Sequence, residues 1–233
     1  MAAPRLYYFA DPMCSWCYGF APVFDKLRAA YANELDIRLV MGGLRPGQLA
    51  EPMTPARARL MRQHWREVAK MTGQPFEDDI LKREDFLYDT EPAAKAVVTM
   101  ELIQPAEAYM YYHEIQRGFY AHSQDITAPE VLANFGRRFG VTEKDFLETF
   151  NSETAHKETW GQFTFSASLG VKGFPALVLE EDGQFMLLMR GYQPFEQISL
   201  TLAKVLKGAG ASSQGTGVSG TSTGDSCEMN GEC

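Results

Sequence analysis

The sequence Asp11-Pro12-Met13-Cys14-Ser15-Trp16-Cys17-Tyr18 joins an apolar run over residues 6–10 to an amphipathic segment over residues 20–31. This order predicts a strand, a tight turn and a helix that begins near the first cysteine. The free N–H groups and the positive dipole end of such a helix favour the thiolate form of Cys14. Cys17 lies one helical turn further along and is placed to attack a mixed disulfide formed at Cys14. The sequence therefore predicts thiol–disulfide chemistry.

Composition and charge restrict the possible partners of the chain. Its 233 residues carry a net charge of −8, which argues against nucleic acid and anionic membranes as partners because both need basic surface. No apolar run approaches the roughly 18 residues that span a bilayer, and the first residues lack the core of a signal peptide. We therefore expect a cytoplasmic protein, where cysteine pairs are more often catalytic or metal-binding than structural.

The pattern of apolar residues predicts an α/β fold. Strands over residues 5–10 and 36–41 flank the first helix, which favours a parallel pair with a right-handed crossover. Apolar runs at 174–180 and 185–189, separated by Asp182-Gly183, predict a hairpin, and residues 194–207 predict a final helix. No strand pattern occurs between residues 45 and 150. Helical spacing instead predicts helices over residues 54–72, 92–103, 106–120, 128–139, 143–150 and 153–169, with capping boxes at Thr127 and Thr142.

Several of these features resemble the DsbA-like branch of the thioredoxin superfamily. Cys14-Ser15-Trp16-Cys17-Tyr18 resembles its active-site turn, and Pro22 matches the proline that kinks its active-site helix. Gly173-Phe174-Pro175 resembles the loop whose proline is cis and faces the dithiol. Residues 11–17 and the segment Gly42-Gly43-Leu44-Arg45-Pro46-Gly47 are most similar to cytoplasmic members of the FrnE type. The resemblance covers residues 5–207 and implies a thioredoxin fold with an all-helical insertion after the second strand.

The resemblance also implies a division of the chain and roles for individual residues. Residues 1–44 and 151–207 would form the thioredoxin-like domain, and residues 45–150 the inserted helical domain. Residues 208–233 would be a flexible Gly/Ser/Thr-rich tail that ends in a cysteine pair. Cys14 would attack a substrate sulfur and Cys17 would resolve the mixed disulfide. Pro175 and the backbone of Phe174 would hold an extended substrate strand, with the Phe174 ring as an apolar wall and Trp16 exposed toward the substrate.

The chain departs from the family pattern at two places. The buried acid that thioredoxin and DsbA carry six residues before the first cysteine is replaced by Tyr8. Asp11 is a candidate substitute, although an Asp-Pro pair at a strand end is more simply a turn. The residues between the cysteines, Ser15 and Trp16, are not the usual pair, which leaves the direction of electron flow open. Ser15 either donates to the Cys14 sulfur or occupies the helix start.

The remaining candidates have simpler interpretations. A zinc site at the dithiol is disfavoured because zinc needs four ligands, and the four histidines show no ligand spacing. Cys227 and Cys233 are either thiols without a defined role, a weak metal site, or a second redox pair. A flexible linker of this length spans about 25 Å, so the second redox pair could reach Cys14 or Cys17.

These observations together predict a thiol–disulfide oxidoreductase or disulfide isomerase. Its partners would be protein or small-molecule disulfides and thiols, glutathione among them, and no metal or organic cofactor is needed. One rival is a glutathione-dependent enzyme of the kappa transferase or hydroxychromene-carboxylate isomerase type, which resembles this chain around Asp11-Pro12 but generally carries serine at the position of Cys14. The other rival is a chaperone that binds apolar segments and does not use its cysteines.

Overall fold

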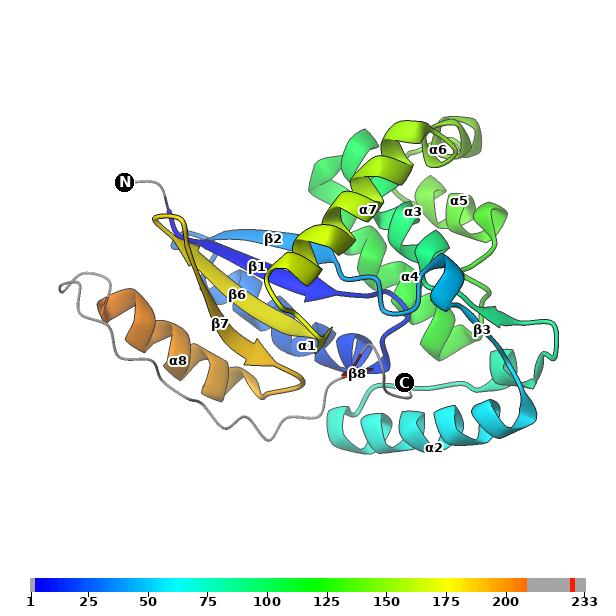
Figure 1. The fold of residues 1–233 in the computed structure, drawn as a ribbon, viewed down its shortest axis with the longest axis horizontal. Helices are drawn as coiled ribbons and strands as arrows, with labels where there is room; N and C mark the ends of the chain where they lie inside the picture. Colours follow the sequence, from blue (N-terminus) through cyan, green and yellow to red (C-terminus); the bar gives the residue numbers. More distant parts are fainter. Residues whose placement is uncertain (1–2, 209–226, 229–233) are drawn as a thin grey trace.

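The computed structural model describes residues 3–208 and 227–228 and centres on a four-stranded sheet (Figure 1). The strands lie in the order β2-β1-β6-β7, and β1 runs parallel to β2 and antiparallel to β6. The hairpin between β6 and β7 turns at Asp182 and Gly183, which both have positive φ, as the Asp-Gly signal predicts. The bounds are β1 Arg5–Ala10, β2 Asp36–Met41, β6 Ala176–Glu181 and β7 Gln184–Arg190. The predicted strands and the hairpin are confirmed.

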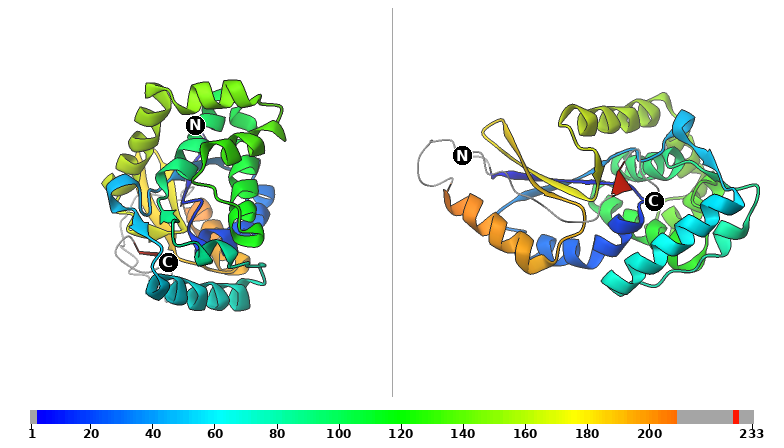
Figure 2. Two further views of the ribbon diagram at one scale, coloured as in Figure 1. Left: turned by 90° about the vertical axis from the view of Figure 1, so that its right-hand side faces the viewer. Right: turned by 60° about the horizontal axis from the view of Figure 1, so that its bottom comes forward.

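Helices cover both faces of this sheet. Helices α1 (Ser15–Ala30) and α8 (Phe195–Gly208) contact each other on one face, and α7 (Glu153–Ser168) packs against β2 on the other (Figures 1 and 2). The outer strand β7 contacts α8 and leaves the apolar side chains of Phe185, Met186 and Leu187 exposed. The carboxyl end of β1 and the start of α1 meet at the sheet end that faces the remaining helices (Figure 1).

The segment between β2 and α7 is helical, as predicted, with one small exception. Its helices are α2 Pro55–Thr72, α3 Glu91–Ile103, α4 Ala108–His122, α5 Pro129–Arg137 and α6 Glu143–Phe150, with short 3-10 turns at Gly47–Leu49, Asp79–Lys82 and Pro105–Glu107. The expectation of no strand here is wrong in detail, because β3 (Glu51–Pro52) pairs with β4 (Leu87–Tyr88). Two residues per strand are too short to produce a periodic signal.

One of the two predicted capping boxes forms. Thr142 accepts a hydrogen bond from the backbone N–H of Asp145 at 3.2 Å and donates to its carboxylate at 2.7 Å. The prediction at Thr127 is wrong, because its hydroxyl donates to Asp125 and the residue that precedes α5 is Ala128, whose side chain cannot cap. The side chain of Asp125 accepts from the Thr127 backbone as well, which stabilises a turn rather than the helix start.

A second short ladder brings the end of the chain back to the start of α1. Strand β5 (Gly173–Phe174) pairs antiparallel with β8 (Cys227–Glu228), with Gly173 opposite Glu228 and Phe174 opposite Cys227. Figures 1 and 2 both show β8 beside the first turn of α1. The rest of the predicted flexible tail, apart from Gly208 at the end of α8, lies outside the described residues.

The α/β fold class with a thioredoxin-type core and a helical insertion is confirmed. The division of the chain at residues 44 and 151 stays a prediction. Within residues 3–208 and 227–228, no helix is both long enough and apolar enough to cross a bilayer.

Candidate active site

The two cysteines lie where β1 ends and α1 begins. Cys14 immediately precedes α1, its backbone N–H donates to the carbonyl of Asp11 at 3.1 Å, and its own carbonyl accepts from Tyr18 N–H at 3.1 Å. This turn and the first helical turn fix Cys14 and Cys17 on neighbouring positions of one helix face. Both are free thiols and both are fully buried.

The two sulfurs interact with each other and with the loop before β6. Burial raises the pKa of the Cys17 thiol well above its usual range, and a hydrogen bond to the Cys14 sulfur raises it further. Cys17 is therefore a neutral donor at physiological pH. The Cys14 thiol in turn donates to the carbonyl oxygen of Phe174 at 3.6 Å. Burial and the hydrogen bond to the Cys14 sulfur therefore both disfavour a thiolate at Cys17.

The Phe174-Pro175 peptide bond is cis, and the loop packs directly against the dithiol. The Phe174 ring does not form the exposed apolar wall that the sequence predicted. It is fully buried, and a Cβ built on Gly42 would come within 2.1 Å of its ring atoms. The absence of a side chain at Gly42 thus makes room for the ring, and the backbone of Phe174 pairs with β8.

Trp16 is not exposed, contrary to the prediction. Its side chain is 2% exposed, and its ring lies edge-on to His64 of α2 at 5.8 Å and tilted against Tyr192 at 6.0 Å. The insertion and the segment after β7 cover this ring, which a pattern local to the turn cannot reveal. Ser15 is also buried, and its hydroxyl finds no partner within the described part of the chain, so donation to the Cys14 sulfur is not observed.

Asp11 is a turn residue and also a buried acid. Its carboxylate accepts from Met13 N–H at 2.9 Å, which closes the predicted turn, and from Leu44 N–H at 2.8 Å. Burial nevertheless raises the pKa of Asp11 to about 6, against the opposing effect of these hydrogen bonds. The charge of Asp11 contributes to the raised pKa of Cys17, and the Asp11 backbone N–H bonds to the Cys17 sulfur. One residue therefore links the turn, the loop after β2 and the second cysteine.

Neutral phenols take the place of the missing acid behind the dithiol. The hydroxyls of Tyr8 and Tyr112 lie 3.3 Å apart, and the Gln116 side-chain amide donates to Tyr112 at 3.0 Å. Burial raises the pKa of Tyr8 well above its usual range, and the nearby Cys17 adds to this. Tyr112 of α4 is fully buried, and it brings these hydrogen-bonded phenols close to Cys17.

Other site residues had no recognised signal in the sequence. Tyr88 of β4 donates a hydrogen bond to the carbonyl of Met13, and Thr90 contacts the Asp11 carboxylate. Leu44 N–H reaches Asp11 because the preceding Gly43 has a φ of 71°. The Gly42-Gly43 pair belongs to the segment that resembles the FrnE type, and the structure adds it to the site. Two consecutive glycines directly after a strand are a sequence signal for a backbone that turns sharply toward a neighbouring group, and this signal could have identified the loop.

The other candidates lie apart or outside the description. Cys227 lies in β8 opposite Phe174, whereas Cys233 is outside the described residues. Among the described residues, no group of three or more His, Cys, Asp or Glu side chains could hold a metal ion.

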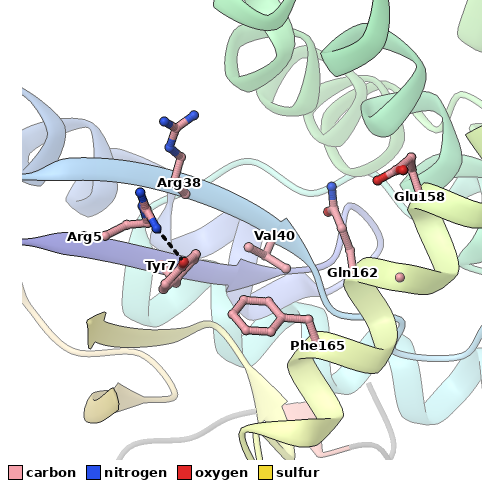
Figure 3. Close-up of a pocket in the computed structure, with 8 residues that line it drawn as sticks. Arg5, Tyr7, Arg38, Val40, Glu158, Gln162 and Phe165 are labelled. Atoms are coloured by element: carbon pink, nitrogen blue, oxygen red, sulfur yellow. Dashed lines mark hydrogen bonds between the residues drawn. The ribbon is translucent and has the colours of Figure 1, made fainter. Parts of the chain in front are cut away.

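A hollow of about 380 Å³ lies elsewhere, between β1, β2 and α7 (Figure 3). Its lining mixes polar and apolar groups and contains neither cysteine: Arg5, Tyr7, Arg38, Val40, Glu158, Gly161, Gln162 and Phe165.

Known proteins resemble this chain over most of its length. The model of the DSBA-like thioredoxin domain matches residues 5–203. A Nitrosomonas europaea structure, provisionally assigned as a protein disulfide isomerase, is 36% identical with a TM-score of 0.83 and covers 89% of this chain and 99% of its own. The cytosolic disulfide reductase DsbM of Pseudomonas aeruginosa is 28% identical with a TM-score of 0.72, covering 86% and 98%. DsbM has also been solved with GSH.

A curated relative carries a different kind of name. The ClpXP adapter protein SpxH of Halalkalibacterium halodurans is 24% identical over 87% of this chain and 73% of its own length. The family match spans nearly the whole described core, and the fold and the cysteine-bearing turn agree with it. The chain belongs to the DSBA-like thioredoxin domain family, whose characterised members include thiol–disulfide oxidoreductases.

Proposed function

We propose that this protein is a thiol–disulfide oxidoreductase or disulfide isomerase that uses Cys14 and Cys17 to exchange disulfides with protein or small-thiol substrates. The observation that carries the proposal is the pair of reduced, buried thiols at the start of α1, with Cys17 donating to the Cys14 sulfur. This arrangement supports a division of labour, because the raised pKa of Cys17 disfavours it as the first attacking thiolate.

In the first step the Cys14 thiolate attacks one sulfur of a substrate disulfide. The substrate S–S bond breaks, a Cys14–substrate disulfide forms, and the leaving thiolate takes a proton. In the second step Cys17 loses its proton and attacks the Cys14 sulfur. A Cys14–Cys17 disulfide forms and the second substrate thiol is released, so the dithiol loses the two electrons that the substrate gains. Isomerisation would follow if the substrate's own thiol released Cys14 before Cys17 attacked.

Asp11 is the proposed proton acceptor for Cys17. At neutral pH its carboxyl is mostly ionised, since its pKa is about 6, and its charge is felt by the Cys17 thiol. A buried carboxylate near a buried thiol offers a proton site where water has little access. This role would substitute for the acid that Tyr8 replaces.

The loop at Phe174 and Pro175, the helical insertion and the similarity to DsbM support a proposal for the substrate and the location. The proposed substrate strand would pair with the Phe174 backbone, and Pro175 would hold that loop against the dithiol. The inserted helical domain over residues 45–150 would supply specificity, since it contributes His64 and Tyr88 to the surroundings of the dithiol. A DsbM structure contains GSH, which supports glutathione among the small thiols. Because DsbM is described as cytosolic, we also propose a cytoplasmic location.

The test is a pair of serine substitutions that separate the two steps. Cys14→Ser should abolish reduction of insulin disulfides and rescue of a scrambled disulfide protein. Cys17→Ser is the matched control, because it keeps the attacking sulfur and should accumulate a mixed disulfide with substrate, visible as a mass increase. Insulin reduction that persists in Cys14→Ser would refute the proposal.

An adapter role is a second candidate, because the SpxH relative is named an adapter and β7 has three consecutive exposed apolar residues, Phe185, Met186 and Leu187. Clusters of exposed apolar side chains often mark protein-binding surfaces. Binding to purified ClpXP that survives Cys14→Ser/Cys17→Ser and is lost in Met186→Lys would support this role.

A further inference from the structure

The helix that follows Cys14 holds only one side of its backbone. Cys14 is the residue before α1 and has extended φ and ψ angles of −89° and 115°, whereas Cys17 lies inside the first helical turn. The carbonyl of Cys14 joins the helical ladder by accepting from Tyr18 N–H, but the peptide bond on its amino side lies outside that ladder. The direction of the Cys14 sulfur relative to Cys17 therefore depends on contacts that fix the peptide between Met13 and Cys14.

Three hydrogen bonds fix the chain on the amino side of Cys14. Two of them come from Asp11, whose carboxylate accepts from Met13 N–H at 2.9 Å and whose carbonyl accepts from Cys14 N–H at 3.1 Å. The third comes from the insertion, because the Tyr88 hydroxyl donates to the Met13 carbonyl. Met13 and Tyr88 are both buried, so water has little access to replace this bond if it is lost. Tyr88 thus holds the oxygen of the same peptide whose N–H bonds to Asp11.

The surroundings of Tyr88 explain how a residue of the insertion reaches the turn. Tyr88 lies in β4, which pairs with β3 in the short ladder. Two residues further on, Arg45 N–H donates to the Thr90 side chain at 3.0 Å, and Thr90 N–H donates to the Arg45 carbonyl at 3.1 Å. The residue before Arg45 is Leu44, whose N–H bonds to the Asp11 carboxylate. The segment that carries Tyr88 and Thr90 therefore contacts both the turn and the loop that supports it.

We propose that Tyr88 is a positioning residue for disulfide exchange, which fixes the peptide before Cys14 so that the Cys14 sulfur stays within reach of Cys17. The inference rests on the proposed function of the two cysteines and adds a residue that acts through the backbone. In the second step of that function, the Cys17 sulfur attacks the Cys14 sulfur, the bond between Cys14 and the substrate breaks, and the substrate thiolate leaves and is protonated. This step is intramolecular, so it depends on how well the two sulfurs are held together.

Mixtures of reduced and oxidised glutathione measure how well the sulfurs are held. The full chain, with Cys227→Ser/Cys233→Ser so that only the dithiol reacts, is equilibrated in such mixtures, quenched in acid and analysed by mass spectrometry. The ratio of the Cys14–Cys17 disulfide to the Cys14–glutathione disulfide, multiplied by the concentration of reduced glutathione, is the effective concentration of Cys17. Tyr88→Phe should lower this effective concentration about tenfold and should change the formation of the mixed disulfide much less.

Tyr111→Phe is the matched control. The Tyr111 hydroxyl donates to the carbonyl of Leu132 at 3.0 Å, neither residue has exposed surface, and the bond joins α4 to α5 within the insertion. Tyr88→Phe and Tyr111→Phe each remove one buried phenol–carbonyl bond and should lower the midpoint of thermal unfolding by similar amounts. Only Tyr88→Phe should change the effective concentration of Cys17, because its bond ends at the residue before Cys14.

A second pair of variants tests the loop that supports the turn. Thr90→Val removes the oxygen that accepts from Arg45 N–H, so the loop that holds Asp11 is less firmly fixed. Thr90→Val should therefore lower the effective concentration of Cys17 about threefold, in line with the loss of one hydrogen bond. Thr90→Ser keeps that oxygen and should restore the wild-type value. If Tyr88→Phe unfolds, this pair decides the question, and equal values for Thr90→Val and Thr90→Ser overturn the proposal.

Three outcomes with folded Tyr88→Phe protein would overturn the proposal: an effective concentration equal to that of the wild type, an equal fall in Tyr111→Phe, or a fall in mixed-disulfide formation as large as the fall in effective concentration. Failure of the proposed function gives a different result, since Cys14→Ser protein would then still reduce insulin. If insulin reduction depends on Cys14 while Tyr88→Phe leaves the effective concentration unchanged, only the role of Tyr88 is wrong.

Discussion

The dithiol region at the start of α1 and the hollow between β1, β2 and α7 arrange their polar groups in opposite ways. Around the dithiol, Asp11 and both cysteines have no exposed surface, and the Asp11 carboxylate accepts from two backbone N–H groups, whereas the buried Ser15 hydroxyl has no partner within the described residues. In the hollow of Figure 3, Arg38 and Glu158 are exposed and water can solvate them. The hollow has volume, but neither cysteine lines it, whereas the dithiol region contains two thiols that are fully buried. The two adjacent thiols, rather than volume, mark the region where chemistry is expected.

Each region has, within it or at its edge, one acid with a raised pKa. The largest expected effect is therefore a change in the free energy of unfolding with pH. Burial raises the pKa of Asp11 from 3.8 to about 6 and that of Glu101, whose carboxylate accepts from Gln162 at the edge of the hollow, from 4.5 to about 7. The folded state therefore binds protons that the unfolded state has released. This stabilisation is full below about pH 4 and is lost as pH rises through the folded pKa. Asp11 alone should account for about 3 kcal/mol of lost unfolding free energy between pH 4 and 7.

Urea unfolding at several pH values measures this effect. Asp11→Asn should flatten the fall between pH 4 and 6, and Glu101→Gln should flatten a smaller fall that extends to pH 7, because Glu101 is only partly buried and solvent screens it. If the free energy of unfolding of the wild type rises from pH 4 to 7 as much as that of both variants, neither acid has a raised pKa.

A pair of glycines makes the second comparison. Gly42 lies under the Phe174 ring, and a methyl group there would come within 2.1 Å of buried ring atoms. Gly42→Ala should therefore lower the free energy of unfolding by about 2 kcal/mol and, because the Phe174 backbone contacts Cys14, also slow disulfide exchange. Thermal unfolding and insulin reduction give the two readouts.

Gly161 is the matched control, because it lines the hollow on α7 and a methyl group there meets nothing within 4 Å. Gly161→Ala should be neutral or stabilising by up to about 1 kcal/mol, since alanine favours the helix. Equal losses of stability at both positions would contradict the packing described here.

The sequence predicts the parts of the site that have local signals. Local residue types identify the turn, the two cysteines and the Gly173-Phe174-Pro175 loop. The spacing of apolar residues then shows which strand or helix precedes and follows each of them. Trp16 shows the limit: its exposure depends on His64 and Tyr192, which come from α2 and from the segment after β7. Strand β8 shows the same limit more strongly, since two residues have no period and only the fold brings them to Phe174.

The smallest expected effect tests whether Asp11 serves the chemistry of Cys17 or only the turn. Asp11→Asn keeps one oxygen that can accept from Met13 N–H, so the turn should persist, whereas Leu44 N–H bonds to the other carboxylate oxygen and loses its acceptor. It removes the proton acceptor, but it also removes a charge that raises the pKa of Cys17, and the two changes oppose each other. We therefore expect resolution of the Cys14 mixed disulfide to slow about tenfold at pH 7, less than the loss usual for a general base. Release of a fluorescent thiol in a single turnover measures this step. The wild-type rate should rise as pH passes through about 6, and Asp11→Asn should lack this inflection while Glu101→Gln retains it. A uniform slowing with the inflection intact would mean that Asp11 acts only by shaping the turn.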